Sequence, residues 1–253
     1  MEKYTFPQIG QKHNFTPLFS AKRATEGRRK IPKKAIFIYS KRLGDILKRE
    51  LSLKPYRHEI GTDGGISKAH TYITKDGKML VVGLPIGAPL TGVTAEEAIA
   101  CGTKEILILG TAGTMSDSLE ISDVILCDRA IRDEGVSHHY LKSSKYVKPD
   151  KSLTKKLGAA MTRAGIKFVF GTTWTIDAPY METKEEIRHY KEEGVAAVEM
   201  EAAALFAVTK KRNAKSAAVF TVSDILGAKW SGFVTKHTGF RRLATVAKLF
   251  KDL

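Results

Sequence analysis

Short apolar runs alternate with segments of helical periodicity along most of the chain. The runs predict buried strands at residues 34–40, 106–109, 124–127, 167–170, 195–198 and 217–222. Apolar residues at helical spacing, or charged segments between strands, predict helices at residues 43–51, 94–101, 153–164, 184–193, 202–211 and 235–253. This alternation predicts an α/β fold in which helices flank a mixed, mostly parallel central sheet.

Turn-forming residues mark a hairpin and several loops. Asp76-Gly77 lies between apolar stretches and predicts a hairpin, because Asp-Gly suits a primed turn. Glycine and proline predict loops at residues 83–89 and 174–183, and residues 1–33 form an irregular basic arm with at most a short helix. With no repeat or linker, residues 1–253 are expected to form one domain.

Two glutamates stand where an apolar run meets an alanine-rich helix. Glu199 and Glu201 flank Met200, directly before the helix predicted at residues 202–211. Ligands of α/β sheets bind outside the carboxyl ends of strands, and Asp224 closes a second apolar strand at the same expected edge. The three carboxyl groups form a candidate site; the structural alternative is that acids stabilise a helix N-terminus.

Composition limits the classes of protein to consider. A chain of 253 residues with 43% hydrophobic residues can bury one substantial core. We find no apolar run long enough for a membrane helix and no signal-peptide core at the N-terminus, which predicts a cytoplasmic protein. Cys101 and Cys127 lie in apolar contexts and are expected to be buried thiols. No cluster of side chains has metal-ligand spacing, so no metal is expected.

The net charge of +15 is concentrated near the N-terminus. Residues 1–60 contain fifteen Lys/Arg and five Asp/Glu. Such a segment is compatible with a nucleic-acid-binding arm, but its basic residues are mixed with apolar ones and lack an aromatic stacking platform. A basic rim that attracts an anionic small molecule is the interpretation we favour over nucleic acid.

The acidic junction also carries a family resemblance. Val198–Ala203, followed by Thr221–Asp224, resembles the signature of the nucleoside phosphorylase superfamily, which contains purine nucleoside phosphorylases, uridine phosphorylases and related nucleosidases. Gly110–Gly113 and Ala130–Gly135 extend the resemblance. It implies a three-layer phosphorylase-like fold and phosphate-dependent cleavage of a nucleoside to free base and ribose 1-phosphate. It further implies inorganic phosphate as co-substrate without a cofactor, and a homo-oligomer (a dimer or a trimer of dimers).

The resemblance gives the acidic residues roles. It implies that Glu201 accepts hydrogen bonds from ribose hydroxyls, with Glu199 in the same ribose site and Met200 against the sugar. A carboxylate can accept two hydroxyl donors, and a thioether packs readily on a sugar face. Asp224 matches the acid with which purine-cleaving relatives protonate N7 of the base; its alternative is a helix N-cap. Glu201 and Asp224 are thus the expected catalytic residues.

Other ligand-binding residues follow from the same resemblance. Thr111 with Gly110 matches the phosphate site and Gly113 the base site, in what we expect to be a glycine-bounded turn. A plain strand-to-helix turn would explain the glycines equally well. Base-pocket walls are expected from the loop after residue 170, namely Trp174, Pro179 and Tyr180.

Two departures from the family pattern bear on whether phosphate or water is the nucleophile. Phosphorolytic relatives carry an arginine at the position of Ile108, and a Pro-Gly-Asp-Pro-x-x-Arg loop where this chain has residues 39–44. Lys41 and Arg42 are candidates to replace the missing positive charge. The alternative for both residues is that they are solvated residues at the start of a helix. Hydrolysis by a nucleosidase is a further possible function, although that branch of the family usually has a glutamate after its first strand and this chain has none there.

The preferred base is also open at this stage. Residues 130–140 resemble the uridine phosphorylase version of the segment, but Thr183 and Glu185 stand where uracil recognition uses Gln and Arg. Asp224 favours a purine. The alternatives are uridine phosphorolysis and a non-catalytic relative that binds nucleotides or nucleic acid.

Overall fold

The strands form one mixed sheet in the computed structural model, which describes residues 12–57, 60, 70–227, 230–232 and 237–253. Its strand order is β11-β10-β6-β8-β9-β5-β1-β4-β3-β2, with β7 paired to β6. The longest ladders, β5–β10 and β6–β8, are parallel, while β10–β6 and β5–β9 are antiparallel. The strands are β1 (Lys34–Ile38), β2 (Lys54–Pro55), β3 (His70–Ile73), β4 (Met79–Gly83), β5 (Glu105–Thr114), β6 (Val124–Asp133), β7 (Tyr146–Val147), β8 (Val169–Ile176), β9 (Ala197–Glu199), β10 (Lys215–Leu226) and β11 (Trp230–Gly232).

Part of this sheet closes on itself. Besides pairing with β6, β10 pairs along most of its length with β5. The pairings β5–β10, β10–β6, β6–β8, β8–β9 and β9–β5 therefore form a ring of five strands. This closure leaves β1, β4, β3 and β2 as an extension from β5.

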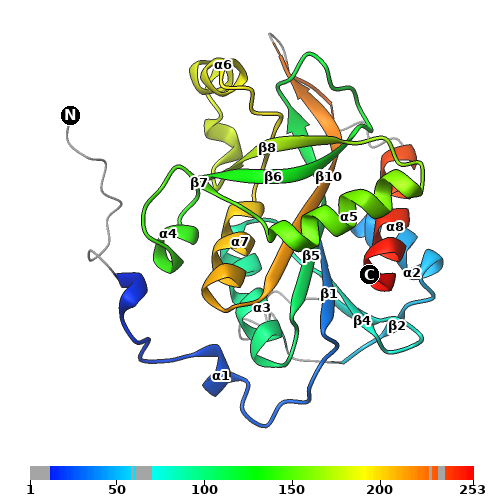
Figure 1. Ribbon diagram of the computed structural model, residues 1–253. Helices are drawn as coiled ribbons and strands as arrows, with labels where there is room; N and C mark the ends of the chain where they lie inside the picture. The colour runs from blue at the N-terminus through cyan, green and yellow to red at the C-terminus, as the bar shows by residue number, and fades with distance from the viewer. Residues whose placement is uncertain (1–11, 58–59, 61–69, 228–229, 233–236) are drawn as a thin grey trace.

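Helices cover both faces of the sheet (Figure 1). Because side chains alternate along a strand, Ala35 and Phe37 of β1 face one core cluster and Ile36 and Ile38 the other. Helices α3 and α7 pack on the first cluster, and α2, α5 and α8 on the second. The helices are α1 (Ala21–Ala24), α2 (Lys41–Glu50), α3 (Ala88–Ala100), α4 (Ser137–Tyr140), α5 (Lys151–Arg163), α6 (Lys184–Glu192), α7 (Ala202–Lys211) and α8 (His237–Asp252), with the short 3-10 turns η1 (Lys12–Asn14) and η2 (Pro179–Met181).

The predicted α/β architecture is confirmed, but three local predictions are wrong. Gly110–Gly113 is no turn, because these residues continue β5 and pair with β10. Trp174 lies inside β8 rather than in a loop, since that strand extends to Ile176 along β6. Helix α3 begins at Ala88, six residues before the predicted start, with proline in its first turn where no amide donor is needed. Both cysteines are buried and free, as expected.

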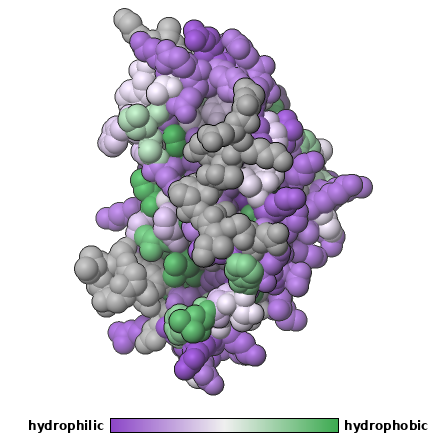
Figure 2. Space-filling model, turned by 90° about the vertical axis from the view of Figure 1, so that its left-hand side faces the viewer, coloured by the Kyte–Doolittle hydropathy of each residue, from purple (hydrophilic) through white to green (hydrophobic). Residues whose placement is uncertain are grey.

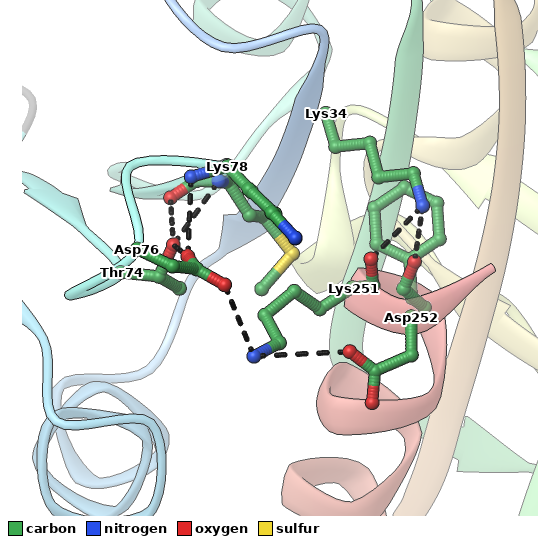
Figure 3. A network of polar contacts seen from close by, with 8 residues as sticks. Lys34, Thr74, Asp76, Lys78, Lys251 and Asp252 are labelled. Carbon is green, nitrogen blue, oxygen red and sulfur yellow. Dashed lines mark hydrogen bonds and ion pairs between the residues drawn. The ribbon is translucent and has the colours of Figure 1, made fainter.

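A polar network attaches the end of α8 to the sheet (Figure 3). Lys34 Nζ donates to the carbonyls of Phe250 and Lys251, each at 3.0 Å, and so satisfies acceptors at the end of that helix. Lys251 in turn pairs with Asp76 at 3.4 Å, in the hairpin turn between β3 and β4. Hydrogen bonds from Thr74 and the Lys78 amide lower the pKa of Asp76 to about 2. The network joins β1, the predicted hairpin and the C-terminal helix.

Candidate active site

Glu199 ends β9 and uses both carboxylate oxygens within the protein. Oε1 accepts from the hydroxyls of Thr173 and Thr175 at 3.1 and 2.5 Å. Oε2 accepts from the amides of Glu201 and Ala202 at 2.8 and 2.7 Å, at the start of α7. Burial raises the pKa of Glu199, and the four bonds oppose this shift. This geometry matches the structural interpretation of the acid, the capping of a helix, so we leave Glu199 out of the proposed ligand contacts.

The Glu201 side chain reaches the loop before α3. Its Oε1 accepts from the Gly87 amide at 2.7 Å, and the residue is 4% exposed. Burial, together with the neighbouring charge of Glu199, raises its pKa to about 8. Gly87 has φ 114°, a backbone conformation that favours glycine and aims its amide at the carboxylate. Met200 lies between the two acids and is partly exposed.

Asp224 lies on the opposite side of β5 from Glu201. Within the sheet, Gly113 pairs with Val198 of β9 and with Asp224 of β10. A Cβ atom at Gly113 would overlap with Leu226 Cδ1 and lie 2.7 Å from Asp224 Oδ2, so a larger residue would have to displace these two side chains. Asp224 Oδ1 accepts from the Ser223 hydroxyl at 2.6 Å, and Oδ2 accepts from the Trp230 indole N–H at 3.2 Å. The helix N-cap alternative is wrong, because β10 continues through Leu226.

The predicted phosphate-binding residues belong to β5 and to the segment that follows β1, the strand next to it. Ile38 of β1 pairs with Leu109 of β5, so the loop after Ile38 runs beside Gly110 and Thr111. Lys41 and Arg42 are exposed in the first turn of α2, whose N-cap is Ser40. The Arg42 guanidinium lies 5.9 Å from the centroid of the Phe240 ring.

Ile108, which stands in place of the family arginine, is fully buried in the first core cluster.

The three predicted base-pocket residues lie in different environments. Trp174 is fully buried; its indole N–H donates to Asp133 at 2.8 Å and its ring packs on Tyr190. An indole enclosed in this way has no surface to offer a base, so Trp174 is a core residue in this structure. Pro179 and Tyr180 form the short turn η2, where the Tyr180 side chain is fully exposed.

Residues that the sequence did not single out also face this region. Tyr39 and Thr91 hydrogen-bond to each other at 2.8 Å, and Thr91 binds the Gly87 carbonyl next to the Glu201 contact. Glu182 follows η2, and its pKa is raised to about 7 by burial and by the charges of Asp224 and Glu186. The signals for these residues were weak, because Tyr39 reads as the end of a strand and Glu182 as one acid in a charged segment.

The raised pKa of Glu182 predicts a pH-dependent stability. A carboxyl group with a higher pKa in the folded state stabilises the fold when protonated, and this contribution is lost as pH rises from about 4.5 through about 7. Glu182→Gln should remove this loss. Relative to wild type, the free energy of unfolding of the variant should therefore increase by on the order of 1–2 kcal/mol between about pH 5 and about pH 8, a value reduced because the side chain is partly exposed. Urea unfolding at the two pH values measures it. Glu185→Gln, at an exposed carboxylate of α6, is the control, and equal pH dependence of both variants would contradict the assignment.

A separate cavity of about 600 Å³ contains none of the predicted site residues. It lies between the N-terminal segment, α3 and the end of α7, with Phe15, Phe19, Val93 and Arg212 in its wall. Figure 2 shows one face of the molecule, on which polar side chains predominate and apolar side chains lie in several separate places. Within the described residues there is no group of three potential metal ligands and no helix long and apolar enough to cross a membrane. The acidic residues of the candidate site lie at β9 and β10, the strands that pair with β5, and this cavity therefore stays outside the candidate site.

Comparison with known proteins identifies the family of the chain. The model of the Phosphorylase superfamily matches residues 36–247. A purine nucleoside phosphorylase DeoD-type from Dichelobacter nodosus is 30% identical over 173 residues, which cover 67% of this chain and 73% of that protein. A guanosine phosphorylase from Halorubrum lacusprofundi is 31% identical over 144 residues, 56% of this chain and 59% of that protein.

Solved structures share the fold at lower identity. A purine nucleoside phosphorylase from Toxoplasma gondii, in complex with immucillin-H, superposes with a TM-score of 0.74 at 16% identity, covering 88% of this chain and 91% of that one. A uridine phosphorylase from Vibrio fischeri gives 0.72 at 21% identity, covering 87% and 91%. Both enzymes carry the arrangement of strands and helices described above.

Proposed function

We propose, since the chain belongs to the phosphorylase superfamily, that it cleaves the N-glycosidic bond of a purine nucleoside with phosphate as the nucleophile. The products are the free base and ribose 1-phosphate. The observation that carries the proposal is the pairing of Gly113 with both β9 and β10, which sets Glu201 and Asp224 on either side of β5. Inorganic phosphate is the co-substrate, and the reaction uses no cofactor.

The two acids suit the two charges that develop during cleavage of the N-glycosidic bond, one on the ribose and one on the base. As the bond breaks, the ribose gains oxocarbenium character and the base gains negative charge. In the proposed reaction Glu201, whose carboxylate accepts from the Gly87 amide, accepts hydrogen bonds from the ribose hydroxyls and holds the sugar. Asp224 donates a proton to the departing base, which removes the developing charge. Met200 is proposed to pack on the sugar.

The anion would bind where the loop after β1 meets β5. Thr111 offers a hydroxyl, Gly110 a peptide group without a side chain, and Lys41 and Arg42 offer positive charge nearby. Since Ile108 is in the core, positive charge for phosphate has to come from another segment such as this loop. Attack by water in place of phosphate is the second candidate, and the absence of the arginine at Ile108 is the observation that favours it.

A purine is the proposed base for two reasons. Asp224 suits protonation of N7, and Thr183, at a position where pyrimidine recognition would need a long amide, instead caps α6 in a reciprocal bond with Glu186. Pro179, Tyr180 and Gly113 are proposed to border the base. We further propose that the enzyme is cytoplasmic and a homo-oligomer, with nucleosides and phosphate rather than nucleic acid as its partners.

The test is release of free base from inosine, guanosine, adenosine and uridine, with and without phosphate. We expect release that requires phosphate and is fastest for a purine nucleoside, together with formation of ribose 1-phosphate. Equal release without phosphate would establish hydrolysis instead. No release from any of the four would contradict the proposed function.

A further inference from the structure

A continuous set of hydrogen bonds leads from the loop after β1 to Glu201. The Tyr39 hydroxyl lies 2.8 Å from Thr91 Oγ1, and Thr91 Oγ1 lies 3.0 Å from the Gly87 carbonyl oxygen. The Gly87 amide donates to Glu201 Oε1 at 2.7 Å. Three elements far apart in sequence, the ends of β1, α3 and β9, are joined in this way.

The direction of each bond follows from the available hydrogens. The only hydroxyl hydrogen of Thr91 is engaged with the Gly87 carbonyl, which can only accept. Thr91 Oγ1 must therefore accept from Tyr39, so the phenol is the donor at the start of the chain of bonds. Thr91 is fully buried, and Tyr39 packs against the first core cluster, so water does not readily replace either partner.

The middle of this chain of hydrogen bonds fixes the backbone of Gly87, which would otherwise be free to rotate. Gly87 has φ 114° and precedes the first residue of α3, where its amide is outside the helix ladder. Its carbonyl accepts both from the Thr91 amide, at 3.3 Å, and from the Thr91 hydroxyl. Holding the carbonyl restricts rotation about Gly87, and the amide on the other side of that residue stays aimed at Glu201.

Tyr39 also belongs to the segment proposed to bind the anion. It immediately precedes Ser40, the N-cap of α2, and the exposed cations Lys41 and Arg42. A displacement of this loop would therefore move the phenol that begins the chain of bonds. One chain of hydrogen bonds therefore connects Glu201, the proposed ribose-binding residue, with the loop after β1 that is proposed to bind the anion.

We propose that Tyr39 is a positioning residue which, through Thr91 and Gly87, holds Glu201 in the orientation that accepts the ribose hydroxyls. The role rests on the proposed function, because it acts on the sugar contact of that reaction. The proposed role of Tyr39 acts through Glu201 and needs no contact between the phenol and the substrate. Its effect should be specific to substrates whose hydroxyls Glu201 binds.

The test compares sugars that differ by one hydroxyl. Tyr39→Phe removes one bond from the chain of hydrogen bonds and Thr91→Val removes two, and each variant is expected to lower kcat/KM for a ribonucleoside about tenfold. With the 2′-deoxy and the 3′-deoxy nucleosides, each of which lacks one of the hydroxyls that Glu201 is proposed to bind, the loss should be smaller than with the ribonucleoside, because part of the contact being positioned is already gone. Thr91→Ser keeps the hydroxyl and should restore activity with the ribonucleoside.

Tyr72→Phe is the matched control, since this tyrosine of β3 contacts Lys48 and lies outside the chain of bonds. A general loss of stability would penalise all three sugars equally, so equal losses in Tyr39→Phe and Thr91→Val would overturn the role. Failure of Thr91→Ser to recover activity would overturn it as well. Lack of turnover by the wild-type enzyme would instead overturn the proposed function, and with it the basis of this role.

Discussion

Glu201→Gln is expected to lower kcat/KM for a ribonucleoside by roughly 10²–10³-fold while the protein stays folded. The glutamine keeps the size of the side chain and can still accept from the Gly87 amide, but it cannot offer two anionic acceptors to the ribose hydroxyls. Steady-state kinetics with inosine, and circular dichroism for folding, measure the two properties. Glu193→Gln, at a surface carboxylate paired with Lys145, is the control.

The pH profile adds a second test of Glu201. Since its pKa is raised to about 8 in the free protein, the carboxylate form becomes dominant only as pH rises through that value. The kcat/KM of the wild type, which reports on the free enzyme, should therefore increase through about pH 8. This increase should be missing from Glu201→Gln. A folded variant with wild-type kinetics would contradict the ribose role.

Asp224→Asn should affect purine and pyrimidine nucleosides unequally. An amide cannot protonate N7, so we expect kcat for a purine nucleoside to fall by roughly 10²–10⁴-fold. Any residual activity toward uridine should change far less, because a pyrimidine has no N7 to protonate. The Asn oxygen can accept from the Trp230 indole N–H while its amide group donates to the Ser223 hydroxyl, so the local structure should persist.

The measurement is kcat for inosine and uridine in wild type, Asp224→Asn and Asp117→Asn. Asp117 is an exposed surface acid paired with Lys191, and its variant should match the wild type. Equal losses for both nucleosides in Asp224→Asn would rule out the role of proton donor. Such a result would assign Asp224 to the shape of the pocket instead.

The sequence predicted those features that depend on neighbouring residues. The junction at Glu201 and the strand ending near Asp224 could be located because an apolar run, an acid and a helix follow one another directly. Their relative placement could not, because it depends on Gly113 pairing with two strands that are distant in sequence. The roles of Glu199 and Trp174 were hidden for the same reason, since their partners come from β8, α7, β6 and α6.

Glycine was informative at the hairpin turn, where Gly77 has φ 70°, but less so at the candidate site. At Gly110–Gly113 it suggested a turn, whereas the structure uses Gly113 within a strand to admit the Asp224 side chain. At Gly87 it marked a loop correctly, but the need for that glycine comes from a positive φ and from a carboxylate 114 positions later. Backbone pairing and side-chain room are properties of the assembled fold, and local patterns do not encode them separately.

The ring formed by β5, β10, β6, β8 and β9 holds the two acids at a fixed spacing, whereas the turn η2 lies outside the ring and can vary. Glu201 follows a strand of this ring and Asp224 belongs to one, so altering the spacing between the acids would require breaking ladders on both sides of β5. The turn η2, with its exposed Tyr180, contributes no strand pairing to the ring. Under the proposed function, substitutions there should alter the choice of base without displacing the two acids, which makes this turn the natural starting point for evolving or engineering a new substrate preference.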